Sequence, residues 1–278
     1  MKPFLKWVGG KTRLIKQYEQ LSLIPERFNN YYEPFLGGGA MFFYLMERNL
    51  VKGCILNDLN FELMSTYAQV KHSVDFVLAQ VSLFEALHKQ SPSGEYFNYL
   101  RSQHFIDLDS SIQKAAKFIY LNKACRSGIW RVNRKGQFNV PMGDPEQTIF
   151  QPELLIGASD ALNRAGAILT SINGLDILRI MQPGDFAFID PPYHDTYGEY
   201  NSVKFKEKHQ TELRDVCVDL KKRECKFLLS NSDTAFIREL YSDTSVFEIH
   251  EVERSGQINS NAKDRGKVSE LAITRVEK

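Results

Sequence analysis

Four consecutive residues carry the groups needed to hold an exocyclic amine while it is alkylated: they are Asp190, Pro191, Pro192 and Tyr193. They follow the apolar run 186–189, which predicts that they lie where a buried strand ends. An amine such as N6 of adenine is a poor nucleophile because its lone pair is delocalised into the ring. A carboxylate at Asp190 and a backbone carbonyl at Pro191 would accept its two N–H groups and leave the lone pair facing the incoming methyl group.

The prolines and the tyrosine fit the same chemistry. Pro191 lacks an N–H and has a fixed φ, and Pro192 restricts Pro191 to extended geometry. Tyr193 could lie flat on the base, as aromatic side chains do in enzymes that act on flipped-out bases. On stacking alone, phenylalanine would replace Tyr193 well. The same residues are also compatible with a strand that ends in a stiff loop and exposes a tyrosine.

A second group of residues could bind a nucleotide cofactor. The stretch 30–35 predicts a short strand, and Gly37 to Gly39 lead from it into the helical apolar pattern of 40–45. A further strand at 54–58 ends in Asp58, 19 residues beyond Gly39, and this spacing suits a carboxylate that binds ribose hydroxyls. Asp58 could instead cap a helix, since aspartate is a favoured cap residue.

A basic segment provides the charge that a phosphate backbone would require. Between Lys123 and Lys135 the chain has five basic residues and no acidic one. Trp130 and Phe138 are interleaved with them, which favours a nucleic-acid surface over a merely solvated face. The stretch 128–141 predicts two short extended pieces around a turn, a hairpin that would present basic side chains to a groove.

Composition sets wider limits. The chain has 278 residues, of which 43% are hydrophobic and 25% charged, as in soluble globular proteins with a sizeable core. The net charge of +1 neither favours nor excludes nucleic acid. The four cysteines and six histidines lack metal-ligand spacing, and the sequence has no apolar leader or membrane-length span. We therefore expect a cytoplasmic protein that binds no metal and no membrane.

Strands that alternate with helices predict an α/β fold. Helical periodicity runs through 61–122; after a helix at 152–164, strands and helices alternate from 167 to 240. Two last extended stretches, 245–252 and 268–275, would form an antiparallel pair at the sheet edge. We expect a Rossmann-like sheet in a catalytic domain of residues 1–60 and 145–278. A mainly helical recognition domain with a β-hairpin would be inserted as residues 61–144.

Together these motifs resemble those of Dam-type DNA adenine-N6 methyltransferases, the D12 class. The resemblance covers most of the chain and rests on residues 4–11, 33–39, 57–58, 128–133, 136–141, 190–193 and 230–231. It implies a Rossmann-like methyltransferase sheet and an enzyme of class EC 2.1.1.72. Such an enzyme transfers methyl from S-adenosyl-L-methionine to N6 of a flipped adenine in double-stranded DNA, as in restriction-modification systems.

The resemblance also implies a role for each matching residue. The residues that match the cofactor pocket are Trp7, Lys11, Phe35, Gly37, Gly39, Asp58 and Asp190, and those that match the catalytic loop are Asp190, Pro191, Pro192 and Tyr193. Lys6 matches a lysine that contacts an outer base, and Arg131 an arginine that contacts guanine, with Ile129 and Pro141 as apolar contacts to thymine. The remaining expected DNA contacts are Arg126, Ser127, Asn133, Arg134, Lys135, Arg254, Arg265 and Lys267.

Two of these residues depart from the family pattern, and alternatives stay open. The family often has a wedging aromatic residue at the position of Arg126 and asparagine at the position of Ser127. With Arg131 and Lys6 as contacts to guanine, the resemblance points to the palindrome GATC as the target. A methyltransferase of amines in RNA or another nucleic acid is an alternative, as is a DNA-binding module without catalytic activity. The intact Asp190 and the glycine loop favour an enzyme.

Overall fold

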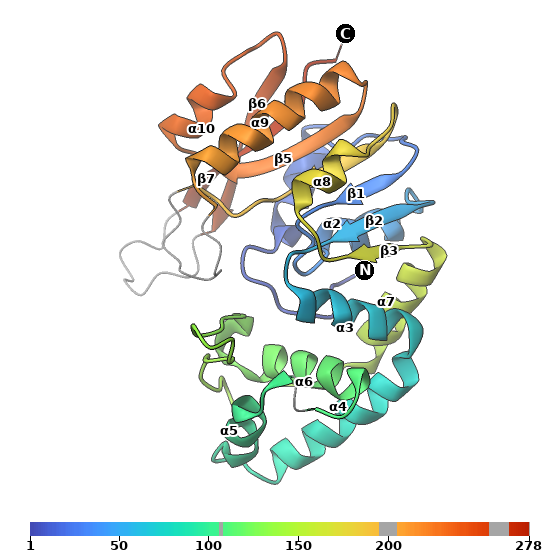
Figure 1. Cartoon of the computed structure of the whole chain (residues 1–278), viewed down its shortest axis with the longest axis vertical. Helices are drawn as coiled ribbons and strands as arrows, with labels where there is room; N and C mark the ends of the chain where they lie inside the picture. Colours follow the sequence, from blue (N-terminus) through green and yellow to red (C-terminus); the bar gives the residue numbers. More distant parts are fainter. Residues whose placement is uncertain (106–107, 195–204, 256–266, 278) are drawn as a thin grey trace.

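The computed structural model describes residues 1–105, 108–194, 205–255 and 267–277. The described strands form one seven-stranded sheet in the order β3-β2-β1-β4-β5-β7-β6 (Figure 1). Their bounds are β1 Tyr31–Glu33, β2 Cys54–Asn57, β3 Ile168–Thr170, β4 Phe186–Ile189, β5 Lys226–Ser232, β6 Phe247–Ser255 and β7 Lys267–Arg275. The first five strands are parallel, whereas β7 pairs antiparallel with both β5 and β6. The predicted α/β class and the antiparallel pair at the sheet edge are confirmed.

The order of the strands fixes where a ligand can bind. β1 has β2 on one side and β4 on the other, so the direction of winding changes between β1 and β4. In open α/β sheets, ligands bind outside the carboxyl ends of the strands at such a switch point. The glycine loop follows β1 and Asp190 follows β4, so both lie at this place.

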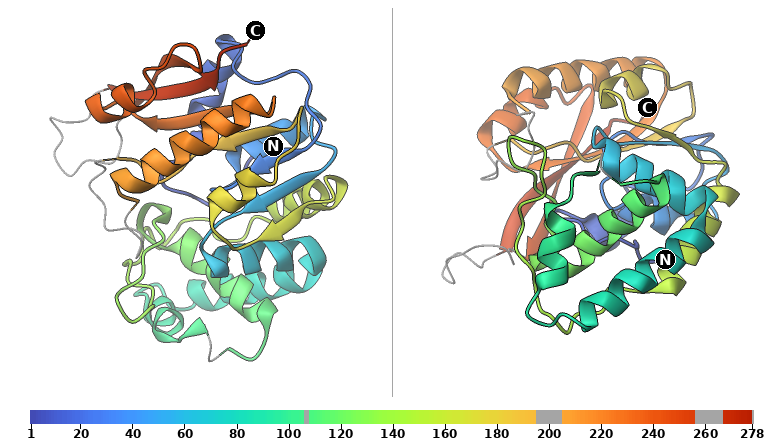
Figure 2. Two further views of the ribbon diagram at one scale, coloured as in Figure 1. Left: turned by 45° about the horizontal axis from the view of Figure 1, so that its top comes forward. Right: turned by 60° about the horizontal axis from the view of Figure 1, so that its bottom comes forward.

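Helices cover both faces of the sheet (Figure 2). The helices near the sheet are α1 Ile15–Gln20, α2 Ala40–Glu47, α7 Pro152–Arg164, α8 Gly174–Arg179, α9 Glu207–Lys222 and α10 Ala235–Leu240, together with the 3-10 turn η1 Lys11–Arg13. Tyr31 and Phe186 face a core formed with α1, α2 and α7, whereas Tyr32 and Ala187 face a core formed with α8, α9 and α10. This alternation follows from the two-residue period of a strand.

The insertion packs as a helical layer below the sheet. Its elements are α3 Phe61–His72, α4 Val74–Lys89, α5 Glu95–Ser102, α6 Ser111–Ala124 and the short turn η3 Arg126–Gly128. α3 and α4 both pack against α6, and α3 also packs against α7. The apolar side chains of this layer belong to the same hydrophobic cluster as one face of the sheet. The domain boundaries at 61 and 144 therefore stay a prediction, because one core continues across them.

Local sequence signals explain several helix starts. Asn60, Ser110 and Thr234 each cap a helix by accepting a hydrogen bond from a backbone N–H of its first turn. The cap of α3 is thus Asn60, and the alternative role of Asp58 as the capping residue is wrong. The alternation of strands and helices predicts a helix over 210–222, and the structure begins this helix, α9, three residues earlier at Glu207. None of the described helices is long and apolar enough to cross a membrane.

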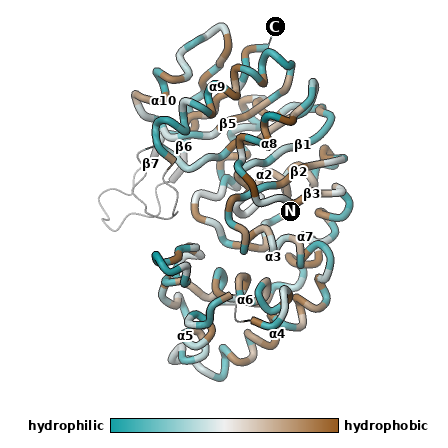
Figure 3. Tube along the Cα trace, viewed as in Figure 1, coloured by the Kyte–Doolittle hydropathy of each residue, from teal (hydrophilic) through white to brown (hydrophobic). Residues whose placement is uncertain are grey.

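The expected hairpin is present but irregular. Its two arms are joined by single bridges, Val132 with Phe138 and Cys125 with Met142, rather than by a continuous ladder. The turn between the arms is hydrophilic (Figure 3). Trp130 anchors the hairpin, because its ring stacks on Phe118 of α6 at a centroid distance of 3.7 Å.

Candidate active site and nucleic-acid interface

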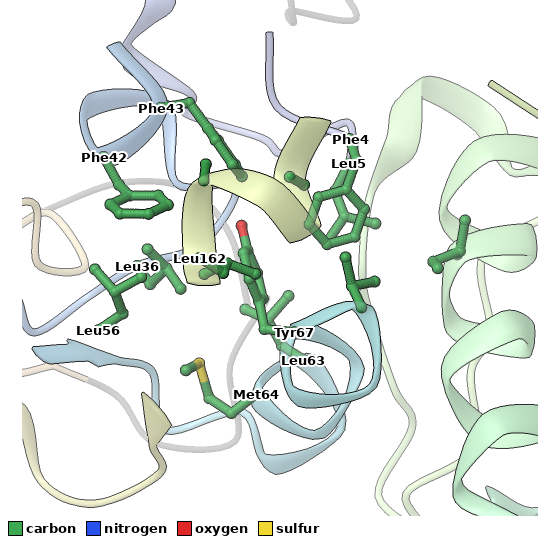
Figure 4. Packing of buried hydrophobic residues seen from close by; sticks show 14 of the residues in the cluster. Phe4, Leu5, Leu36, Phe42, Phe43, Leu56, Leu63, Met64, Tyr67 and Leu162 are labelled. Carbon is green, nitrogen blue, oxygen red and sulfur yellow. The ribbon is translucent and has the colours of Figure 1, made fainter. Parts of the chain in front are cut away.

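The glycine loop after β1 adopts a conformation that only glycine takes easily. Gly37 and Gly39 have φ values of 49° and 68°, in the left-handed region. A Cβ at Gly37 would lie 2.6 Å from Nε1 of Trp7, so the indole ring packs directly on the loop. Below the loop, Tyr67 packs edge-on against Phe4 in the core shown in Figure 4, and its hydroxyl donates to the Gly37 carbonyl (3.3 Å). The expected cofactor residues Trp7, Gly37 and Gly39 are therefore brought together.

Asp58 ties the end of β2 to this loop. One carboxylate oxygen accepts from the Gly37 N–H (2.9 Å), and the other from the Asn60 N–H (3.0 Å). Burial raises the pKa of Asp58, and the two backbone N–H groups oppose that shift. Phe35, the other expected aromatic residue of the cofactor site, packs against Gly174 of α8, and its ring meets Phe205, just before α9, edge-on at 6.0 Å. The indole ring of Trp7, the glycine loop and the carboxylate of Asp58 thus lie together at the ends of β1 and β2.

Asp190 lies at the end of β4 beside a buried cation. Lys11 Nζ is 2.8 Å from Oδ2 of Asp190 and also donates to the Gly9 carbonyl (2.8 Å). The Lys11 side chain is only 6% exposed. Burial raises the pKa of Asp190, whereas the charge and the hydrogen bond of Lys11 lower it. Lys11 was expected in the cofactor pocket, and the structure pairs it with Asp190, the expected catalytic carboxylate.

Polar side chains from two elements hold the loop that follows Asp190, the expected catalytic loop. Gln210 of α9 donates to the Pro192 carbonyl (3.1 Å), and Ser232 of β5 donates to the His194 carbonyl (3.0 Å). Within the described part of the chain, the carbonyl of Pro191 accepts no hydrogen bond. That oxygen is therefore available as a second acceptor beside Asp190.

The ring of Tyr193 lies close to Lys11, whose Nζ is 4.9 Å from the ring centroid. Its hydroxyl lies 2.6 Å from Ser230 Oγ and donates to Oε2 of Glu270 (2.7 Å). Ser230 and Glu270 are buried, on β5 and β7 respectively. The hydroxyl is thus fixed in the protein interior.

Sequence reasoning missed two of these supporting residues. Gln210 occupies the same face of α9 as Leu213, Cys217 and Leu220, and is as buried as they are. Glu270 is the one acid in β7, and it begins the buried run 270–273 of that strand, whose other residues are apolar. Burying a polar side chain without a hydrogen-bond partner is unfavourable. A polar residue at an apolar position of a helix or strand pattern is therefore a sign of a buried partner, and this sign could have identified both residues.

A buried carboxylate also lies at the end of β1. Glu33 accepts hydrogen bonds from the Tyr31 hydroxyl (2.7 Å) and from the Phe42 N–H (3.1 Å) of α2. Burial raises the pKa of Glu33 to about 8, although the hydroxyl and the N–H oppose the shift. Glu33 therefore connects β1 with α2 and keeps its proton to a higher pH than an exposed glutamate would.

The expected outer-base contact, Lys6, lies against the recognition segment. Asn122 of α6 donates to the carbonyls of both Lys6 (2.7 Å) and Gly128 (3.2 Å), and accepts from the Lys6 N–H (2.9 Å). A Cβ at Gly128 would lie 2.3 Å from Cβ of Lys6, so the two segments are in direct contact. Lys6 Nζ donates to Oε1 of Gln147 (2.9 Å). Residues more than a hundred positions apart thus form one surface.

The hairpin places its basic residues in two settings. Arg131 is half-buried, and its Nε donates to Oδ1 of Asn139 on the opposite arm (2.8 Å). Arg134 and Lys135 are exposed at the turn. Asn133 holds that turn, since its side-chain oxygen accepts from the N–H groups of Lys135 (2.9 Å) and Gln137 (3.0 Å). Asn133 is therefore part of the turn's own hydrogen bonding.

The other expected DNA contacts are distributed around the hairpin and the sheet edge. Arg126, Ser127 and Pro141 are exposed, and Ile129 is half-buried. Arg126 and Pro141 are joined by a backbone hydrogen bond of 3.0 Å. The backbones of Arg254 and Lys267 lie one step apart in the register of β6 and β7, and Arg265 lies outside the described residues.

Comparisons with known proteins agree on a family. Residues 7–258 match the model of the D12 class N6 adenine-specific DNA methyltransferases. The Type II methyltransferase M1.LlaDCHI of Lactococcus lactis subsp. cremoris is 34% identical over 99% of this chain and 95% of its own length. The Type II methyltransferase M.MjaIII of Methanocaldococcus jannaschii is 33% identical over 95% of each chain. A DNA adenine methylase of Haemophilus influenzae is 31% identical over 97% of this chain and 92% of its own.

Proposed function

Because the chain belongs to the D12 class of N6 adenine-specific DNA methyltransferases, we propose that it methylates adenine within GATC in double-stranded DNA. The enzyme class would be EC 2.1.1.72, and the base would be flipped out of the helix. One observation carries the proposal: the ion pair of 2.8 Å between buried Lys11 and Asp190, next to the ring of Tyr193.

The residues at the switch point fit S-adenosyl-L-methionine, the cofactor that the family implies. A cofactor of this kind supplies an electrophilic methyl group on a sulfonium sulfur. Trp7 provides an aromatic surface, and Asp58 provides a carboxylate at the end of β2 for ribose hydroxyls. The left-handed glycines keep the loop between them free of side chains, so the backbone can approach a ligand closely.

Asp190 and the carbonyl of Pro191 would hold the target amine. The two oxygens would accept its N–H groups and turn the nitrogen lone pair toward the methyl group. Burial raises the pKa of Asp190, and Lys11 opposes that rise and so favours the ionised form, which is the acceptor. Tyr193 would stack on the flipped adenine.

Specificity would come from the surface that Lys6 and the hairpin share. Asn139 accepts from Nε of Arg131, which leaves the two terminal nitrogens of the guanidinium for O6 and N7 of a guanine. Lys6 would contact a second guanine, and Ile129 and Pro141 a thymine methyl group. The exposed Arg134 and Lys135 would contact phosphates.

The experiment is methylation with a methyl-labelled cofactor, with duplex DNA, single-stranded DNA and RNA offered separately. We expect N6-methyladenine in the duplex, and sequencing of the modified DNA should locate it in GATC. Methylation of RNA or single strands alone would contradict the duplex substrate. Methyladenine in a motif without guanine would contradict the role of Arg131. Duplex binding without any methyl transfer would favour a binding module.

A further inference from the structure

A chain of buried hydroxyl groups lies beneath the catalytic loop. It starts at Tyr18 of α1, whose hydroxyl donates to Ser230 Oγ (3.2 Å). Ser230 Oγ is 2.6 Å from the Tyr193 hydroxyl, which in turn donates to Oε2 of Glu270 (2.7 Å). Tyr18 and Ser230 are 0% exposed and Glu270 is 2% exposed. Three elements far apart in sequence, α1, β5 and β7, thus meet the loop through one network.

Counting protons gives the network a direction. A hydroxyl has one proton to donate, and an ionised carboxylate only accepts. The Tyr193 hydroxyl faces two carboxylates, Glu270 and Asp190, so its proton goes to a carboxylate. Ser230 must therefore donate to Tyr193, and Ser230 can then accept from Tyr18. Burial and the neighbouring carboxylates of Asp190 and Glu270 raise the pKa of Tyr193 well above its usual range, so this hydroxyl remains a donor. Every hydroxyl in the chain is satisfied, with Glu270 as the terminal acceptor.

A buried glutamate at position 270 destabilises the fold unless its carboxylate makes a compensating interaction. A carboxylate loses its hydration when buried, and here it also opposes the ionisation of Asp190. Leucine or isoleucine would suit the apolar run of β7 better. The gain is directional: a hydrogen bond of 2.7 Å at the far end of the Tyr193 side chain fixes where the hydroxyl lies. Because a phenol O–H prefers the plane of its own ring, the same bond also favours one orientation of that ring.

We propose that Glu270 is a positioning residue, which holds the Tyr193 ring in the plane on which the target adenine stacks beside Asp190. The inference rests on the proposed function. On stacking alone, phenylalanine was expected to replace Tyr193 well. If the hydroxyl holds the ring in place, phenylalanine should replace it poorly. Ser230 supports the same hydroxyl, and Tyr18 contributes least because it lies one bond further away.

The test compares four variants with the wild type on long unmethylated duplex DNA of mixed sequence, which does not presuppose a target motif. Glu270→Leu removes the acceptor, Tyr193→Phe removes the donor, and the double variant removes both. Glu270→Gln keeps a hydrogen-bonding group for the hydroxyl whichever way its amide turns. Glu248→Leu, an exposed carboxylate of β6, is the matched control.

We expect Glu270→Leu and Tyr193→Phe each to lower the single-turnover methylation rate about tenfold, since small displacements of a reacting group have effects of this order or larger. The double variant should be no more than about twofold slower than the slower single variant, because both changes break the same bond. Glu270→Gln and Glu248→Leu should stay within about threefold of the wild type. Calorimetry should give an unchanged cofactor affinity and one cofactor site per folded chain.

Several results would overturn the inference while the proposed function stands. One is a double variant whose loss of methylation rate is the product of the two single losses. Another is a Glu270→Gln variant that is as slow as Glu270→Leu. A third is a variant in which fewer chains bind cofactor but each binding chain reacts at the wild-type rate, because the defect would then be in folding. If Glu270→Leu does not fold, the methylation rates of Tyr193→Phe and Glu270→Gln still test the inference. It requires Tyr193→Phe to be slow and Glu270→Gln to stay near the wild-type rate. A wild-type protein that transfers no methyl group to any nucleic acid would instead refute the proposed function.

Discussion

The catalytic loop and the recognition hairpin are both short irregular segments, yet they are supported in opposite ways. Side chains from η1, α9, β5 and β7 hold the loop 190–194, and most of them are buried. The hairpin 129–141 is held by its own turn and by apolar side chains that pack on the helical layer, namely Trp130 stacked on α6 and the buried Phe138 and Val140. Transfer of a methyl group needs atoms fixed closely, whereas contact with DNA needs side chains that can adapt. The difference suggests that substitutions in the loop act on rate and those in the hairpin on affinity and target choice.

The largest effect should come from Asp190→Ala. Loss of the acceptor should lower the single-turnover rate at least about a hundredfold, as removal of a group that stabilises charge in a transition state does. Cofactor affinity should fall much less. Single-turnover methylation and calorimetry measure the two quantities.

A companion variant separates chemistry from folding. Asp190→Ala leaves Lys11 buried without its carboxylate, which should cost about 3–5 kcal/mol of unfolding free energy. Adding Lys11→Met should restore much of that stability but none of the activity. Equal losses of rate and of cofactor affinity would instead show that Asp190 acts mainly by binding the cofactor. Substitutions in the loop would then not act on rate alone, and the contrast with the hairpin would fail.

The next effect concerns the pH dependence of stability. The pKa of Glu33 is about 8 in the folded protein and has an ordinary value of 4.5, so between these values the unfolded chain releases a proton that the folded chain keeps. The contribution of Glu33 is therefore most favourable below pH 4.5 and is lost as the pH rises toward 8. Glu33→Gln should flatten this part of the stability curve in denaturant unfolding.

A matched variant tests the cause. Glu26→Gln changes an exposed carboxylate outside the site and should leave the curve unchanged. If Glu33→Gln left the slope between pH 5 and 8 as steep as in the wild type, Glu33 would not be the group that holds the proton.

The same contrast explains how much of the molecule the sequence could predict. The parallel strands and their helices follow from local periodicity, and Asp190 and the glycine loop follow from their place at strand ends. The partners of the loop do not, because Glu270 and Gln210 reach it only through the pairing of β7 and the packing of α9. Lys11 was assigned to the cofactor, and only its position in space joins it to Asp190. The single bridges of the hairpin likewise depend on packing against α6.

In the hairpin, the comparison predicts smaller effects of two kinds. Arg131→Ala should reduce discrimination at one guanine position by about 1–3 kcal/mol. Lys135→Ala should weaken binding to all sequences alike and lower the salt slope by about one. Competition binding over a set of single-base variants of GATC, at several salt concentrations, measures both. Lys52→Ala, an exposed lysine just before β2, is the control and should change neither quantity. A uniform loss for Arg131→Ala would make Arg131 a phosphate contact.

The smallest effect should be a gain at Ser127. Its φ of 60° and ψ of 14° lie in the left-handed region, where asparagine is better tolerated than serine. Ser127→Asn should therefore raise stability by about 0.5 kcal/mol, or about 1–2 °C in Tm. Ser22→Asn, at a φ of 56°, should gain similarly, whereas Ser82→Asn inside α4 should not. A gain at Ser22 alone would mean that the hairpin does not hold Ser127 in this conformation in solution. The hairpin would then be looser than the catalytic loop even in its backbone, and the contrast between the two segments would be sharper.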